Sequence, residues 1–374
     1  MLKRFAAIIF LLSPLTLLFC GCWDNAVIEE NTIVTLAGVD TQDKADHTFT
    51  LATVETFTDD EPKFITVKAD IMSEALVKAN NRAANPVRSG KIQNIVFSRE
   101  GAEQGYIPLV DIHKIEEVSR FLPDYLISTT TAAEIFEALG KMKLEEKSLT
   151  YLSHLVKTAA DSGFCPDISS RDYNLDFINE GPDPVLPLLA ADNGKIFVKG
   201  TALFAKEKMV GELPATESVF LNLLLQKKSA FSYYIHFPIE DAAFDTAVFQ
   251  TKRCNAKIAA STKGDDVIID INIKINGLFD KFIWSYLNRV YGAEKVEKHI
   301  ESYFNTNVKS VFTVLQSCNC DPLDIRGSLK KNDFDFYNTH DFSKVYSKAK
   351  VNVSTELNII NDPNPDLNKA IEPK

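Results

Sequence analysis

The sequence lacks the residue patterns that many enzymes and metal proteins require. It contains no Gly-x-Ser-x-Gly elbow, no His-Glu-x-x-His motif, no Gly-x-Gly-x-x-Gly fingerprint and no phosphate-binding loop. Its six histidines are scattered through the chain without the spacing of metal ligands. We therefore expect a protein that is not an enzyme and that carries no cofactor and no metal.

Blocks of basic residues are also absent. The chain has 41 Lys and Arg against 51 Asp and Glu, which gives a formal net charge of -10 at pH 7. Such a chain repels phosphate backbones, so nucleic acid is not an expected partner. For the same reason we expect no electrostatic attraction of the chain to anionic lipids.

Cysteine is scarce, and its spacing defines no metal site. The pair in Cys318-Asn319-Cys320 lacks the two-residue gap of a zinc motif. We favour buried small side chains or free thiols for the four cysteines that follow the N-terminal pair. One disulfide stays an open alternative, because an oxidising compartment would permit it. These four residues are Cys165, Cys254, Cys318 and Cys320.

The one long apolar run lies at the N-terminus. Lys3 and Arg4 precede an uncharged stretch that is shorter than the roughly 20 apolar residues of a membrane-spanning helix. This pattern is typical of a secretory signal peptide, which we predict over residues 1–21. The stretch ends in Gly21-Cys22, where a small residue before a cysteine is similar to a bacterial lipobox. We predict Cys22 as the lipid attachment residue, with acylation at Cys20 or an uncleaved anchor as the alternatives.

The first half of the chain after this junction mixes strand and helix patterns. Residues 32–40 and 48–57 are rich in Thr, Val and Leu, and the polar segment 41–46 between them predicts a hairpin. Strands and helices then alternate between about 61 and 150. We predict strands at 64–67 and 92–97 and helices at 72–83, 112–122 and 131–140.

Residues 161–194 contain four prolines among several Asp, Asn and Ser residues. That composition predicts a long surface connection rather than a regular element. A strand at 195–204, its return at 209–211 and a helix at 214–225 are expected next.

The C-terminal part shows the clearest periodicity. Alternating apolar residues on both sides of Lys263-Gly264-Asp265 predict a long hairpin over 254–275. A helix over 293–316 has an apolar stripe, and a final strand is expected over 345–359. Laying the stripe on an antiparallel sheet would bury both apolar faces. The stripe consists of Val296, Ile300, Phe304, Val308, Val311 and Leu315.

Two further groups of residues each have two interpretations. Asp333, Asp335 and Asp341 could bind calcium, but we favour a solvated acidic loop because no glycine turn organises them. The aromatic residues Tyr233-Tyr234 and Trp284 could line a contact surface, and we favour half-buried packing.

Four passages together resemble the Ger(x)C family, the C-subunit lipoproteins of spore germinant receptors. The first is Gly21-Cys22-Trp23-Asp24 with the strand that ends in Gly38-Val39-Asp40. The others are Ser98–Gly105 after a strand, Gly200–Phe204 with Lys208–Leu213, and the 296–316 helix that leads into Asp321-Pro322-Leu323-Asp324. They occur in the order of the family and extend over nearly the whole chain.

The resemblance implies an α+β fold of three mixed α/β domains, of which the C-terminal one is a mainly antiparallel sheet packed with a long helix. The expected domains are a discontinuous N-terminal one (22–60 plus 161–212), a second (61–160) and a C-terminal one (213–365), with a tail at 366–374.

The resemblance also implies a function. Such proteins lie on the outer face of the spore inner membrane with two integral membrane subunits of the A and B type, and the complex triggers germination. The membrane would be contacted through the lipid anchor, and the nutrient germinant would not be bound directly. A solute-binding lipoprotein of a transporter is the alternative.

Overall fold

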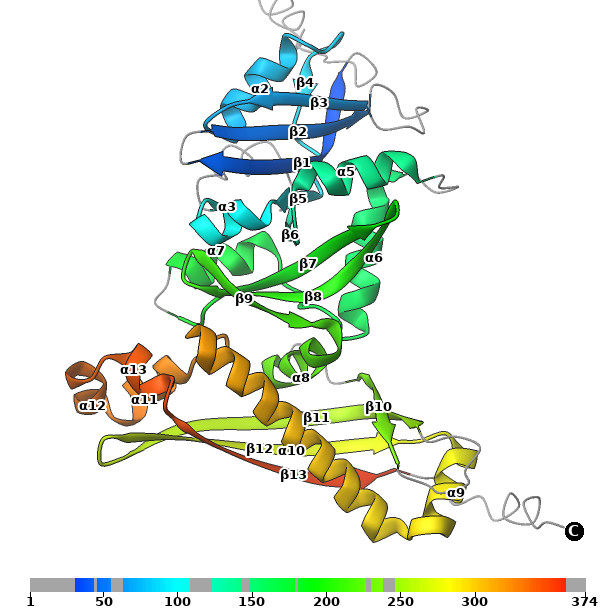
Figure 1. Cartoon of the computed structure of the whole chain (residues 1–374), viewed down its shortest axis with the longest axis vertical. Coiled ribbons are helices and arrows are strands. Elements are labelled where there is room, and N and C mark those ends of the chain that lie inside the picture. The colour runs from blue at the N-terminus through cyan, green and yellow to red at the C-terminus, as the bar shows by residue number, and fades with distance from the viewer. Residues whose placement is uncertain are drawn as a thin grey trace, which may run out of the picture.

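Two β-sheets follow one another along the long axis of the molecule (Figure 1). The computed structural model describes residues 31–43, 46–54, 63–107, 123–142, 148–178, 181–226, 230–237 and 246–360. The predicted signal peptide, Cys22, the helix expected at 112–122 and the tail at 366–374 lie outside these described residues.

The larger sheet has nine strands in the order β3-β2-β1-β5-β6-β7-β8-β9, with β4 beside β1. Strands β1, β5, β6 and β7 run parallel in the centre, and antiparallel strands flank them on both sides. The predicted hairpin at the start of the chain is confirmed, since β1 and β2 pair from Ile33–Val54 to Asp43–Asp46. The strands are β1 (Thr32–Asp43), β2 (Asp46–Val54), β3 (Lys63–Lys68), β4 (Val87–Arg88), β5 (Asn94–Phe97), β6 (Asp124–Ser128), β7 (Val185–Asp192), β8 (Lys195–Ala205) and β9 (Lys208–Pro214).

Helices cover both faces of this sheet, because its central strands are apolar on both sides. Buried residues of α2 (Met72–Asn80), α3 (Arg99–Gln104) and α7 (Ser170–Ile178) join one core. Those of α5 (Ala132–Lys141) and α6 (Ser148–Asp161) join a second core on the opposite face.

The segment 161–194 corrects our expectation of a long surface connection. It contains α7 and the buried strand β7, which lies between β6 and β8. Pro187 is tolerated there because β6 pairs only with Leu188 and Leu189, so its missing N–H removes no bond to β6. The continuous apolar run of β7 is the pattern of a buried parallel strand, and the neighbouring prolines obscured it.

The smaller sheet has the order β10-β11-β12-β13, and α10 (Ala293–Cys318) lies across it. All six residues of the predicted stripe on α10 are buried, which confirms the helix and its inward face. The predicted hairpin is also confirmed, with Lys263 paired to Asp266 across a tight turn. The strands are β10 (Ser232–His236), β11 (Thr246–Lys263), β12 (Asp266–Leu278) and β13 (Lys350–Ile359).

The last strand pair differs from the expected antiparallel arrangement. β13 runs parallel to β12, whereas the β10–β11 and β11–β12 pairs are antiparallel. A parallel pair needs a crossover, and here five helices supply it. One of them, α13, occupies the start of the strand predicted from residue 345. The five are α9 (Lys281–Tyr291), α10, α11 (Ile325–Asn332), α12 (Phe334–Thr339) and α13 (Phe342–Tyr346).

The fold is therefore α+β, with a mainly antiparallel C-terminal sheet. Strands from residues 32–54, 63–128 and 185–214 share the larger sheet, so the division at 60 and 160 stays a prediction about folding units. Helix α8 (Ala215–Leu225) lies between the two sheets, and one buried core extends through both.

Candidate functional site

The predicted lipid attachment residue, Cys22, lies outside the described residues, but the place where the chain enters the body is well defined. Asn31 accepts a hydrogen bond from the Nε of Arg88 at 3.2 Å. The backbone N–H of Thr32 donates to the carbonyl of Pro86 at 3.0 Å. The chain from Cys22 therefore enters the body beside β4. Within the described part of the chain, no helix is long and apolar enough to cross a membrane.

A buried polar junction joins the two sheets, and sequence reasoning did not identify it. The backbone N–H of Asp321 donates to Oδ2 of Asp183 at 2.8 Å, across 138 residues of sequence. The N–H of Asp183 returns a bond to the carbonyl of Asp321 at 2.8 Å. Oδ1 of Asp183 also accepts from the N–H of Lys206. The start of β7, the β8–β9 turn and the segment after α10 thus meet at one carboxylate.

The carboxylate of Asp321 organises the second half of this junction. It accepts hydrogen bonds from the N–H groups of Ile325 and Arg326, at 2.9 and 2.8 Å, and so begins α11. Burial raises the pKa of Asp321 to about 6, because desolvation outweighs these two hydrogen bonds. Arg326 lies 3.8 Å from Asp183 and stacks on the ring of Phe342. The positive charge partly offsets the two buried acids.

The passages that carry the family resemblance meet in the folded chain. Arg99, from the passage after β5, forms a salt bridge of 2.8 Å with Glu212 of β9. Asp40, at the end of the first passage, accepts from the N–H groups of Ala132 and Ala133 and so caps α5. Gly211 lies against the thiol of Cys318, where a Cβ would stand 2.5 Å from the sulfur. The first two contacts tie helices to the larger sheet, and the third joins β9 to the end of α10.

Helix α8 forms a second link between the sheets. Asn222 donates to the carbonyls of Gly163 and Cys165, at 2.7 and 2.9 Å, on the side of the larger sheet. Phe220 packs against Tyr233 and Phe304 on the side of the smaller sheet. A buried helix that bonds to the segment after α6 and also packs on the smaller sheet favours a single body.

Two of the three acidic residues considered for calcium serve as helix caps, and the third, Asp335, is an exposed residue in the first turn of α12. Asp333 accepts from the N–H of Phe336 and from the hydroxyl of Thr262, and Asp341 accepts from the N–H of Ser343. Among the described residues, no group of His, Cys, Asp and Glu is arranged to hold a metal ion.

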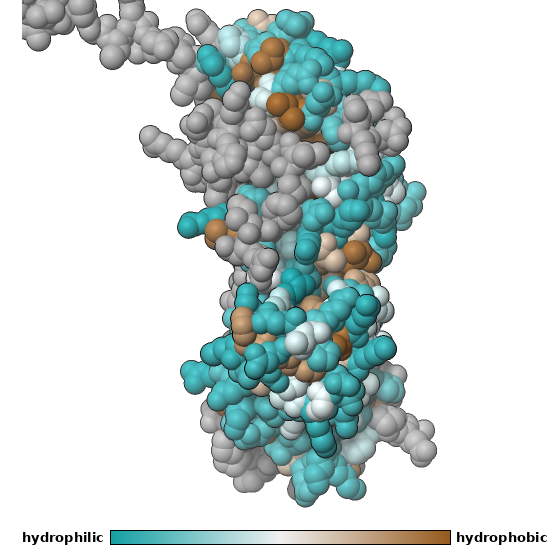
Figure 2. Space-filling model, turned by 90° about the vertical axis from the view of Figure 1, so that its left-hand side faces the viewer, coloured by the Kyte–Doolittle hydropathy of each residue, from teal (hydrophilic) through white to brown (hydrophobic). Residues whose placement is uncertain are grey.

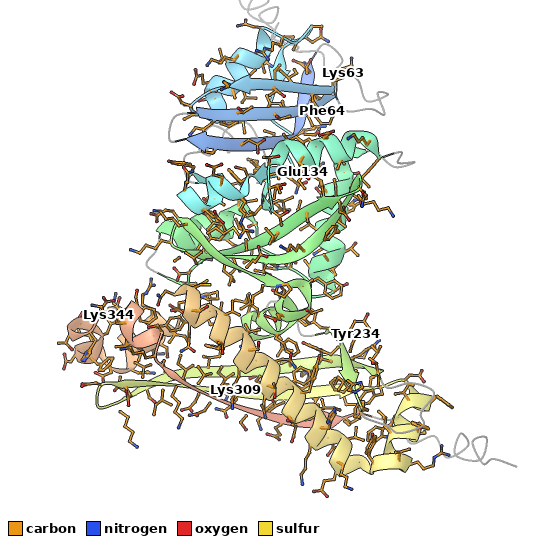
Figure 3. All side chains as sticks on the ribbon, in the orientation of Figure 1. Lys63, Phe64, Glu134, Tyr234, Lys309 and Lys344 are labelled. Carbon is orange, nitrogen blue, oxygen red and sulfur yellow. The ribbon has the colours of Figure 1, made fainter. Side chains whose placement is uncertain are left out.

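The aromatic candidates divide between packing and exposure. Tyr233 is buried among aromatic rings, and Trp284 stacks on Phe279. Tyr234 points outward with 62% of its surface exposed, because neighbours on a strand face opposite sides (Figure 3). The interpretation as packing residues therefore holds for Tyr233 and Trp284, whereas Tyr234 is exposed.

The four later cysteines form no disulfide in the described structure. Cys165 and Cys320 are buried, and Cys254 and Cys318 are half-buried. Burial raises the pKa of the Cys254 thiol to about 12, which makes it a poor nucleophile at neutral pH. The interpretation as small, mostly buried side chains therefore agrees with their environment.

Comparison with known proteins identifies the class to which this two-sheet body belongs. Residues 24–191 match the family described as "Spore germination protein N-terminal domain". Residues 199–362 match the family described as "Spore germination B3/ GerAC like, C-terminal". The two matches lie on either side of the β7–β8 turn and leave only residues 192–198 and the chain ends uncovered.

One curated relative and one solved structure extend over most of the chain. The spore germination protein GerQC of Bacillus cereus is 19% identical over 356 residues, which cover 94% of this chain and 97% of the relative. The crystal structure of the GerBC protein has a TM-score of 0.50 at 16% identity and covers 87% of this chain and 97% of that chain. At this identity the structure supports the fold alone. The chain belongs to the Ger(x)C family of spore germination proteins, which are germinant receptor components and not a known enzyme family.

Proposed function

We propose that this protein is a non-catalytic, lipid-anchored subunit of a spore nutrient germinant receptor, needed for receptor assembly and for triggering germination. It would lie on the outer face of the spore inner membrane, beside two integral membrane subunits of the A and B type. The observation that supports this most is the match of both family domains, in order, behind the Gly21-Cys22 junction. The family assignment does not support the transporter alternative.

A tether explains how such a subunit could act without catalysis. An acyl anchor confines the body to a thin layer above the membrane and raises its effective concentration near the membrane subunits. Two acyl chains hold a protein stably where one is marginal. Weak contacts then suffice for assembly.

The test replaces Cys22 by alanine and compares the variant with Cys20→Ala. We expect Cys22→Ala to remain unprocessed or unacylated, to lower the amount of assembled receptor and to slow germination. Cys20→Ala should still be acylated at Cys22. Mass spectrometry of the mature N-terminus, with co-purification of the membrane subunits, measures both steps. Normal assembly without acylation would refute the tether as the basis of function.

The proposal also states that the body does not bind the nutrient. Calorimetry of the unacylated mature chain with germinant amino acids and sugars measures this directly. Micromolar binding of one of them would overturn this part of the proposal and leave the anchor untouched.

A further inference from the structure

The basic residues of this acidic protein are not evenly distributed. Between residues 63 and 98 the only acids are Asp70 and Glu74, so this segment has a net positive charge. Its cations are all exposed, on β3, α2 and β4 and on the turns that follow α2 and β4. They are Lys63, Lys68, Lys78, Arg82, Arg88 and Lys91.

These elements form one end of the molecule. β3 is the outermost strand of the larger sheet, and α2 and β4 lie beside it at the upper end in Figure 1. The C-terminal sheet lies at the opposite end. We name the six cations, together with Ile71 and Val77, the basic end.

The charges at the basic end are held in place. The Nζ of Lys78 donates to the carbonyl of Lys68 at 2.9 Å, and the guanidinium of Arg82 bonds to the carbonyl of Thr66. Both carbonyls belong to the edge strand β3, so the two side chains also cover its backbone and oppose pairing with another strand. An edge protected in this way favours a partner that is bound by charge rather than by strand addition.

Apolar side chains accompany the cations. Val77 is 67% exposed and Ile71 is 39% exposed, next to Lys78 and the first turn of α2. Figure 2 views the side on which α2 lies and shows apolar patches within a hydrophilic surface at that end. Exposed apolar residues among cations are typical of surfaces that rest on anionic bilayers.

The tether emerges at the same end. Asn31 is hydrogen-bonded to Arg88, and Thr32 is hydrogen-bonded to Pro86. The chain from Cys22 therefore enters the body within the basic end. Nine residue steps separate Cys22 from Asn31, and an extended chain spans about 3.3–3.6 Å per residue. A lipid at Cys22 would hold the basic end within roughly 30 Å of the bilayer.

We propose that the basic end is a membrane-contact face that rests on the anionic headgroups of the bilayer and orients the receptor subunit. This inference takes its geometry from the lipid anchor of the proposed function. It modifies our expectation from net charge, because a bilayer responds most to the charges nearest to it, and charges that lie more than about 10 Å away are largely screened. The C-terminal sheet would then point away from the membrane.

The test uses the unacylated mature chain, residues 22–374 with Cys22→Ser, so that its result does not depend on acylation. Cosedimentation with phosphatidylglycerol vesicles should show binding that phosphatidylcholine vesicles do not support and that rising salt abolishes. The triple variant Lys63→Glu/Lys68→Glu/Lys91→Glu should weaken this binding at least about tenfold. Val77→Asp should weaken it as well.

The matched control is Lys257→Glu/Lys309→Glu/Lys344→Glu, which changes the net charge equally at exposed sites of the C-terminal region. It should bind vesicles as tightly as the parent chain. Thermal melts establish that both triple variants fold. The proposal would be overturned if both triple variants lost vesicle binding equally, or if the parent chain did not bind anionic vesicles. A basic-end variant that binds vesicles normally but loses the membrane subunits would also overturn it and would make this face a protein interface.

Discussion

Asp183 and Asp321 exchange two hydrogen bonds of 2.8 Å each, one through a carboxylate and one through a carbonyl. One residue precedes β7 of the larger sheet, and the other follows the helix that covers the smaller sheet. The side chain of Asp183 is only 4% exposed. The connection between the two sheets is therefore a specific polar contact and not merely apolar burial.

Removing this carboxylate should destabilise the body. Asp183→Ala leaves the N–H groups of Asp321 and Lys206 without their acceptor and removes the carboxylate that lies 3.8 Å from the guanidinium of Arg326. We expect a loss of about 2–4 kcal/mol in the free energy of unfolding. Urea denaturation measures it, with Asp335→Ala on an exposed helix as the control. Equal effects of the two substitutions would contradict the role of the junction.

Asp321 should make stability depend on pH. The pKa of Asp321 is raised to about 6 in the folded chain, while an unfolded aspartate ionises near pH 4. The folded state thus binds this proton more tightly, and the resulting stabilisation is fully present below about pH 4 and lost as pH rises through about 6.

Asp321→Asn removes this titration. The unfolding free energy of the parent minus that of the variant should fall by about 2 kcal/mol between pH 4 and pH 7. Taking the difference cancels Asp124, whose pKa burial also raises to about 6. Urea melts across this range test the prediction, and a difference that does not change with pH would refute it.

The apolar stripe of α10 offers a contrast between neighbouring residues. Val308 is completely buried, whereas Lys309 is exposed (Figure 3). Val308→Asp places a charge without a partner in the core and should cost at least about 4 kcal/mol. Lys309→Asp should cost less than about 1 kcal/mol. Thermal melts compare the stability of the two variants. Similar losses of stability would contradict the burial of the stripe in the core.

Gly200 is required by a close backbone approach. Its φ is +152°, and a Cβ there would lie 2.0 Å from the carbonyl oxygen of Leu213. Gly200→Ala should therefore cost more than about 3 kcal/mol. Gly194→Ala, at φ +74° in open space, should cost only about 1–2 kcal/mol. Circular dichroism melts rank the pair, and the reverse order would contradict the steric argument.

Local patterns predicted much of the fold. The stripe of α10 and the β11–β12 hairpin are long and strongly periodic, so their faces could be assigned without tertiary information. The helix predicted over 131–140 is also confirmed, and the hydroxyl of Thr131 caps it by accepting a hydrogen bond from the N–H of Glu134. The carboxylate of Glu134 accepts a hydrogen bond from the hydroxyl of Thr130.

Strand direction and long-range pairing could not be predicted in this way. Nothing in the residues of β13 shows whether it runs parallel to β12, because direction depends on the path of the crossover helices. Strand β7 was missed because prolines dominate its neighbourhood, although tertiary contacts accommodate Pro187.

The sequence by itself determined the family and the elements whose apolar period is long, and it predicts lipid attachment at Cys22. These properties depend on residues that are close together in the chain. Only the tertiary structure decided that Asp183 meets Asp321 and that the six cations of residues 63–91 share one end of the body with the start of β1. Such contacts depend on how the sheets stack and on the free energy of burying their faces together, which no local pattern records.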